Sequence, residues 1–339
     1  MVAWDVELVG RIEPGTVHSE LLRGNSLGDP HERPVFVYLP PGYDDDADRR
    51  YPTVYVIQGY TGQAAMWFNR NAFQRSVPEM IDDVFARSDT PPAIVVYVDA
   101  WTAYGGSQFL DSPATGRYHS YLCDEVVPWV DDGYRTLDDR DHRAITGKSS
   151  GGYGSMVTPM LRPDLFGALA THAGDALFDV CYPSDFPKVA RILRDEYNGD
   201  YANFLADHKT RVHGTKDSDD LLMEMYAYAA AYSGNPDGTV ALPFDDTGAI
   251  VPDVWDRWLA LDPVRMAKDL GELTAVWIDA GKQDEFYLDL GATAFHKAIK
   301  QAGVSADKIH FELFDGRHGG IQYRYPMAMK WLAERIRSR

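Results

Sequence analysis

The chain has 339 residues, of which 45% are hydrophobic and 25% charged, a composition typical of a soluble globular protein. Its formal net charge of -18 disfavours nucleic acid and anionic membranes as partners. The two cysteines, Cys123 and Cys181, lie far apart and indicate neither a disulfide framework nor a metal site.

The N-terminal residues Met1-Val2-Ala3-Trp4-Asp5 lack a basic segment followed by an apolar one. A secretory signal is therefore not indicated, and no apolar run is long enough to span a membrane. We expect a cytoplasmic protein.

Short apolar runs rich in β-branched and aromatic residues recur between helical patterns and predict strands. They cover residues 35–39, 53–57, 93–99, 142–146, 168–172, 274–279 and 310–314. Most are nearly continuous in apolar residues, as expected for parallel strands covered on both faces. The first follows a turn-rich segment and ends at Pro40-Pro41-Gly42, so we expect it to belong to an antiparallel edge.

Helical patterns fill the gaps between these runs. Apolar residues recur at three- and four-residue steps from Leu290 to Ala302, and again from Met327 to Ile336. Strands that alternate with helices predict an α/β fold, a three-layer α/β/α sandwich with a mostly parallel central sheet. Ligands of such sheets bind at the carboxyl ends of the strands.

The alternation stops in residues 174–264, which are rich in aromatic side chains and in which we expect helices near 189–198 and 219–232. We interpret this segment as a cap-like insertion into a single domain of residues 1–339, folding over the edge where ligands bind. The aromatics could shape an apolar pocket. For any one of them, packing of the insertion against the body is the stronger expectation.

The pentapeptide Gly147-Lys148-Ser149-Ser150-Gly151 directly follows a predicted strand and precedes a helical segment. Strand, G-x-S-x-G and helix in this order is the nucleophile elbow of the α/β-hydrolases, which exposes a serine hydroxyl on a tight turn. A phosphate-binding loop would need a glycine at position 142, where the chain has His142.

A serine nucleophile needs a histidine base and an acid, and in this fold they follow in the order serine, acid, histidine. Asp284 lies on the loop past the strand at 274–279 and is the preferred acid, with Glu285 and Asp279 as alternatives. His318 is the expected base, because it lies beside glycines just past the last strand.

The oxyanion of acyl transfer needs two N–H donors. The first is expected to be the backbone N–H of Ser150, and the second that of Tyr60, with Gly59 as the alternative. Trp67, Trp101 and Tyr104 follow early strands and are weaker candidates for substrate contacts.

Several segments together resemble the putative-esterase family of α/β-hydrolases, which includes S-formylglutathione hydrolase, enterochelin, feruloyl and acetylxylan esterases, and mycolyltransferases. They are Val37-Tyr38-Leu39-Pro40-Pro41-Gly42-Tyr43, Tyr51-Pro52-Thr53-Val54-Tyr55-Val56-Ile57-Gln58-Gly59, Glu125-Val126-Val127-Pro128-Trp129-Val130, Gly147-Lys148-Ser149-Ser150-Gly151-Gly152, Arg162-Pro163-Asp164-Leu165-Phe166 and the tail from Asp284 to His318. Gln58, Lys148 and the long insertion depart from the family pattern.

The resemblance implies Ser149 as nucleophile, Asp284 as acid and His318 as base. We therefore expect a serine carboxylesterase that acts on short-chain or aromatic esters without a cofactor. The alternatives are an acyltransferase or thioesterase, including the S-acylglutathione type, and a non-catalytic binding protein with this fold. The expected partner is a small-molecule ester, and a homodimer is possible.

Overall fold

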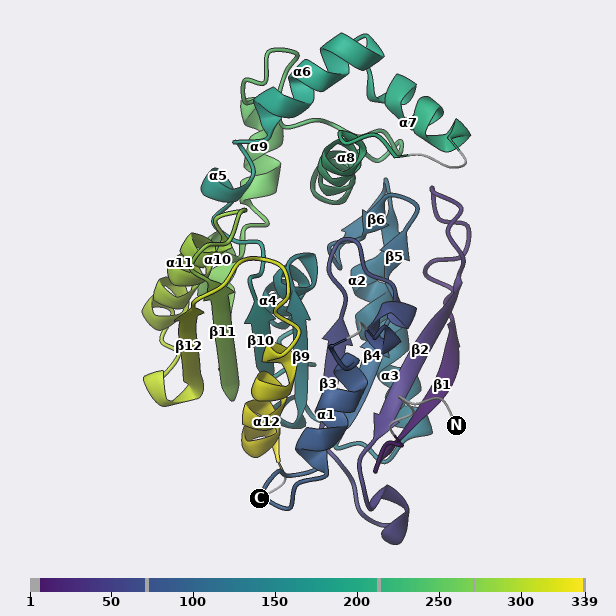
Figure 1. Ribbon diagram of the computed structural model, residues 1–339, viewed down its shortest axis with the longest axis vertical. Helices are drawn as coiled ribbons and strands as arrows, with labels where there is room; N and C mark the ends of the chain where they lie inside the picture. Colours follow the sequence, from purple (N-terminus) through teal and green to yellow (C-terminus); the bar gives the residue numbers. More distant parts are fainter. Residues whose placement is uncertain (1–6, 71–72, 212–214, 271, 338–339) are drawn as a thin grey trace.

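The computed structural model describes residues 7–70, 73–211, 215–270 and 272–337, and is built on one large sheet (Figure 1). Eight strands run in the order β1-β2-β4-β3-β9-β10-β11-β12. They are β1 (Arg11–His18), β2 (Glu32–Leu39), β3 (Thr53–Ile57), β4 (Ile94–Val98), β9 (Arg143–Lys148), β10 (Ala168–His172), β11 (Ala275–Gly281) and β12 (Ile309–Phe314). Strand β2 is antiparallel to both of its neighbours, and the remaining pairs are parallel.

Each predicted strand corresponds to a strand of the sheet, and the bounds of β3 and β10 are those expected. The antiparallel pairing expected of residues 35–39 is confirmed, but the outermost strand of this edge is β1, which was not predicted. Strand β1 is partly exposed and contains Pro14 and Gly15, so its sequence resembles a turn. Proline is tolerated there because an edge strand leaves one row of backbone groups unpaired.

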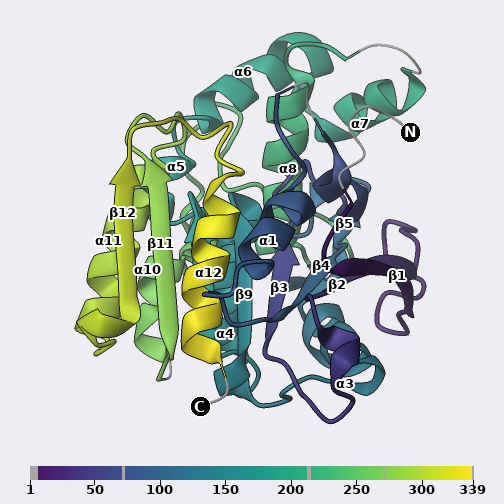
Figure 2. The ribbon, with the colours of Figure 1, turned by 60° about the horizontal axis from the view of Figure 1, so that its bottom comes forward.

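Helices cover both faces of the sheet, so the three-layer prediction is confirmed. Val54 and Val56 of β3 belong to the apolar cluster beneath α1 (Val77–Phe85) and α12 (Arg324–Ile336), which lie side by side in Figure 2. Tyr55 and Ile57 point to the opposite face and its larger cluster. That face carries α2 (Tyr118–Ser120), α3 (Val127–Gly133), α4 (Ser150–Leu161) and α11 (Leu288–Gln301).

The chain between β10 and β11 forms a helical layer beyond the carboxyl ends of the strands (Figure 1). The layer contains α5 (Phe178–Cys181), α6 (Phe186–Tyr197), α7 (Tyr201–Thr210), α8 (Asp219–Ser233) and α9 (Pro252–Leu259), whereas α10 (Pro263–Met266) packs on α4 and α11 beside the sheet. Helices α6 and α8 overlap the two predicted helices, whereas α7 and α9 were not predicted. Many of its aromatics pack on one another, as Tyr182 and Tyr232 do on the fully buried Trp258.

Two short hairpins lie outside the main sheet. They pair β5 (Trp101–Thr102) with β6 (Gly105–Gly106), and β7 (Asp111–Ser112) with β8 (Gly116–Arg117). Within the described ranges, no helix has both the length and the apolar character needed to cross a bilayer.

Candidate active site

Ser149 stands on a strained turn between β9 and α4. Its backbone has φ 58° and ψ -126°, a conformation that residues with a side chain rarely adopt. The turn is held by neighbouring backbone. The N–H of Ser149 donates to the carbonyl oxygens of His172 at 3.0 Å and Ala173 at 3.1 Å, and its own carbonyl accepts from Tyr153 at 2.8 Å.

The glycines around Ser149 permit the close crossing of strand and helix. A Cβ atom on Gly147 would lie 2.5 Å from the carbonyl group of Gly151. One on Gly151 would lie 2.6 Å from the carbonyl oxygens of Ile57 and Gln58. These neighbours are all backbone atoms, so no side-chain movement could relieve the clash.

The imidazole of His318 lies between Ser149 and Asp284. Its Nε2 is 3.1 Å from the Oγ of Ser149, and its Nδ1 is 2.8 Å from the Oδ2 of Asp284. The other oxygen of Asp284 accepts the backbone N–H of Phe286 at 2.9 Å. The side chain of Asp284 is fully buried, and that of His318 is 13% exposed. The structure thus brings together the three residues expected from the sequence, in a geometry suited to proton transfer from Oγ to Nε2.

Glu285, one of the alternative acids, binds His318 only through the main chain. Its Oε2 accepts the backbone N–H of His318 at 3.0 Å, and Oε1 lies 3.4 Å from the guanidinium of Arg317.

Asp279, the other alternative acid, is buried behind the site. It accepts from the Nδ1 of His172 at 2.8 Å, the Nε of Arg324 at 2.8 Å and the Nε1 of Trp277 at 2.6 Å. Burial opposes ionisation of Asp279, but His172 and Arg324 hold the pKa of this carboxyl below its usual value. It therefore has partners of its own and does not contact His318.

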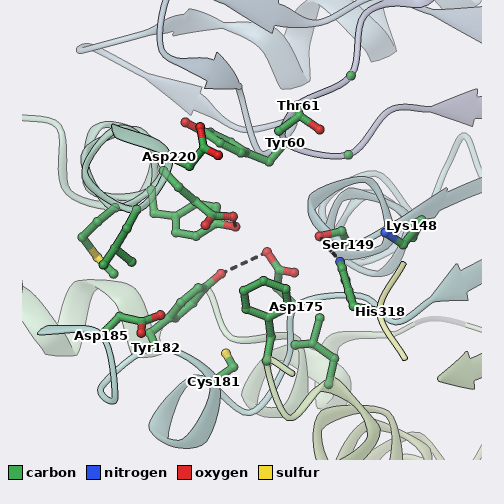
Figure 3. A pocket seen from close by; sticks show the side chains of 18 of the residues that line it. Tyr60, Thr61, Lys148, Ser149, Asp175, Cys181, Tyr182, Asp185, Asp220 and His318 are labelled. Carbon is green, nitrogen blue, oxygen red and sulfur yellow. Dashed lines mark hydrogen bonds between the residues drawn. The ribbon is translucent and has the colours of Figure 1, made fainter. Parts of the chain in front are cut away.

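A cavity of about 470 Å³ opens beside Ser149 and His318 (Figure 3). One wall comes from the loop after β3, including Gly59 and Tyr60. The opposite wall comes from the segment between β10 and β11. Its lining residues are Asp175, Cys181, Tyr182, Asp185, Asp220, Leu221, Glu224, Met225 and Tyr228.

The loop after β3, which carries Tyr60, lies against the turn that carries Ser149 and Ser150. Ser150 is the first residue of α4. A Cβ atom on Gly59 would be 3.0 Å from the carbonyl oxygen of Lys148 and 3.6 Å from the Cβ of Ser149, so this loop packs against the turn. The role of the Tyr60 and Ser150 N–H groups stays a prediction.

The three aromatic candidates for substrate contacts differ in position. Trp67 lines the cavity, although it is almost wholly buried against Tyr325. Trp101 and Tyr104 are not among the lining residues of this cavity, which corrects the expectation. Both belong to the β5–β6 hairpin region, and the Tyr104 ring packs edge-on against Tyr226 at 5.1 Å.

Sequence reasoning missed two carboxyl groups of the cavity wall. Asp175 accepts hydrogen bonds from Gln108 and Tyr182, and burial raises its pKa to about 6. Glu224 accepts from the hydroxyl of Tyr228 at 2.7 Å, and burial raises its pKa to about 7. Asp175 lies just past the end of β10. The same kind of position, just past a strand, marked Ser149, Asp284 and His318 as candidates. Glu224 gave no comparable signal.

Comparisons with known proteins agree on one family and one fold. The family model described as putative esterase matches residues 25–325. A solved ferulic acid esterase is similar with a TM-score of 0.59 and 19% identity, covering 97% of this chain and 98% of that one. An S-formylglutathione hydrolase from Agrobacterium tumefaciens is similar with a TM-score of 0.58 and 19% identity, covering 99% of both chains. At this identity the likeness shows the fold alone.

A curated relative is similar over a shorter stretch. An endo-1,4-beta-xylanase/feruloyl esterase from Xylanibacter ruminicola is 29% identical over 139 residues, which are 39% of this chain and 18% of that protein. The matched stretch therefore spans less than a fifth of that relative's length.

Proposed function

The chain belongs to the putative esterase family, and from this premise we propose that it is a serine carboxylesterase acting on short-chain or aromatic esters through an acyl-enzyme. The observation that carries the proposal is the position of His318, whose two ring nitrogens lie within hydrogen-bond distance of Ser149 and Asp284.

In the proposed reaction, the Oγ of Ser149 attacks the ester carbonyl carbon while the Nε2 of His318 takes its proton. Asp284 fixes the tautomer and stabilises the imidazolium. The backbone N–H groups of Tyr60 and Ser150 donate to the oxyanion of the tetrahedral intermediate. His318 then gives the proton to the departing alcohol oxygen. A water molecule, deprotonated by the same imidazole, attacks the acyl-enzyme carbonyl, and His318 returns that proton to the Oγ of Ser149 as the acid is released.

We further propose that residues 174–264 act as a cap-like insertion within a single domain and select the substrate. This proposal is supported by the lining of the cavity, since residues from α8 face the loop that carries Tyr60 across the site. Trp67 is the remaining aromatic candidate for a substrate contact.

A fluorophosphonate probe with peptide mapping tests the assignment, run beside hydrolysis of p-nitrophenyl acetate, butyrate and octanoate. We expect an adduct on Ser149 and turnover that decreases with acyl length. Ser149→Ala should lose the label and about ten-thousand-fold or more of the turnover. The control Ser155→Ala alters a buried serine of α4, the helix that follows Ser149, and should still be labelled. Substantial turnover by Ser149→Ala would refute the proposal.

A further inference from the structure

The cavity beside Ser149 is acidic on one side. Asp175, Asp185, Asp220 and Glu224 all line it, and all four come from the segment between β10 and β11. Lys148 also lines the cavity. Figure 3 shows it on the other side of Ser149 from the labelled aspartates.

Asp175 offers a free acceptor to a ligand. Both of its hydrogen bonds within the described residues, from Gln108 and Tyr182 at 3.2 Å, reach Oδ2. Its side chain is buried, with 3% of the residue exposed, yet it lines the cavity. In Figure 3 the carboxyl group lies between Tyr182 and Ser149. Oδ1 therefore accepts no hydrogen bond from the described side chains and is left to a ligand in the cavity.

A cluster of tyrosine rings accompanies the carboxyl groups. Tyr228 lies between Tyr60 and Tyr182, with ring centroids 5.8 and 5.1 Å away, and all three line the cavity. The hydroxyl of Tyr228 donates to Oε1 of Glu224. Aromatic faces beside carboxylates are the surroundings that ammonium groups prefer in proteins.

The electrostatics point the same way. Burial makes ionisation of Asp175 and Glu224 costly, as the raised pKa of each carboxyl indicates. A bound cation would stabilise both carboxylates, whereas an anionic ligand would add repulsion in a poorly solvated site. The wall is therefore complementary to a positive charge.

We propose that the substrate of this site is an ester that carries an ammonium group, with the cation held by Asp175, Glu224 and the tyrosine cluster. The inference rests on the proposed function in placing the ester carbonyl at Ser149. The tyrosine cluster is defined as Tyr60, Tyr182 and Tyr228.

Matched pairs of esters that differ only in charge test this proposal. The first pair is butyrylcholine and 3,3-dimethylbutyl butyrate. The second is the p-nitrophenyl ester of 4-(trimethylammonio)butyrate and that of 5,5-dimethylhexanoate, which places the charge on the acyl side. We expect kcat/KM to be at least about tenfold higher for the cationic member of one pair. Equal values, or a faster neutral ester, in both pairs would overturn the proposal.

Substitutions of the acidic residues test whether this wall causes the preference for cationic esters. In Asp175→Asn and Glu224→Gln, the ratio of kcat/KM between cationic and neutral esters should fall toward one. Asp256→Asn is the matched control, because Asp256 is an exposed carboxyl of α9 that does not line the cavity, and it should keep the wild-type ratio. A preference that persists in both cavity variants would contradict the assignment to this wall.

A binding measurement separates this inference from the proposed function. Choline should raise the Tm of the Ser149→Ala protein, and its uncharged analogue 3,3-dimethylbutan-1-ol should have a smaller effect at the same concentration. Hydrolysis of p-nitrophenyl acetate with no response to choline would remove the inference and leave the esterase. A choline response without any ester turnover would support the cation site and refute the esterase.

Discussion

The carboxylate of Glu285 accepts the backbone N–H of His318 at 3.0 Å and leaves the imidazole to Asp284. Two adjacent acids thus bind the same histidine in different ways. One positions the loop and the other contacts the ring, and this difference predicts unequal effects of substitution.

Asp284→Asn should lower kcat for p-nitrophenyl butyrate by about a thousandfold or more, because the amide can no longer stabilise the imidazolium or fix its tautomer. Glu285→Gln should cost no more than about tenfold, because the amide oxygen can still accept the backbone N–H. Steady-state kinetics of the two purified variants measures both. If Glu285→Gln were the more damaging substitution, the assignment of the acid would be wrong.

Gly147→Ala should destabilise the protein by about 3 kcal/mol or more, since its Cβ would meet the backbone of Gly151 and Ile57. Gly133→Ala is the matched control at the end of α3. A Cβ there meets no atom within 4 Å, so the variant should be as stable as wild type or slightly more so. Urea unfolding compares them, and equal midpoints would contradict the close approach.

Asp279→Asn should lower the free energy of unfolding by about 3 kcal/mol, because it leaves Arg324 and His172 without their buried anion. Since the carbonyl of His172 holds the turn of Ser149, the variant should also lose activity. Asp83→Asn, which alters an exposed pair with Arg75, should change stability by about 1 kcal/mol at most. Chemical denaturation tests both, and similar losses would refute a special role of the buried network.

Glu224→Gln should change how stability depends on pH. Burial raises the pKa of this carboxyl from 4.5 to about 7, so between these values the folded protein binds more protons than the unfolded chain. The wild type should therefore lose unfolding free energy as the pH rises through this range, and the variant should lose less. Urea midpoints measured at intervals from about pH 5 to pH 8 report the difference. Parallel curves for the two proteins would contradict the prediction.

The parallel strands could be predicted because their burial on both faces requires nearly continuous apolar runs. Strands β3 and β10 had the expected bounds for this reason. Strand β1 escaped detection because an exposed edge tolerates Pro14, Gly15 and polar residues. The local sequence of an edge strand carries little information about its pairing.

The proximity of Ser149, Asp284 and His318 could be predicted from the sequence, because each follows a strand of the same sheet and parallel strands end at one edge. The cavity wall could not be derived in this way. Glu224 lies on α8, a helix with buried residues on several sides, so periodicity does not reveal which of its faces meets the cavity. Trp101 and Tyr104 were misplaced because they belong to the short β5–β6 hairpin, which the sequence pattern did not predict.

The helices of the acidic wall are carried by one uninterrupted stretch of chain whose ends connect the neighbouring strands β10 and β11. Such a stretch can lengthen, shorten or be exchanged in evolution without moving the loops that carry Ser149, Asp284 and His318. Under the proposed function, the loops at the end of the sheet determine the reaction, and the inserted helices determine the substrate preference. Transplanting the stretch between relatives of this fold should then transfer specificity while the reaction stays the same.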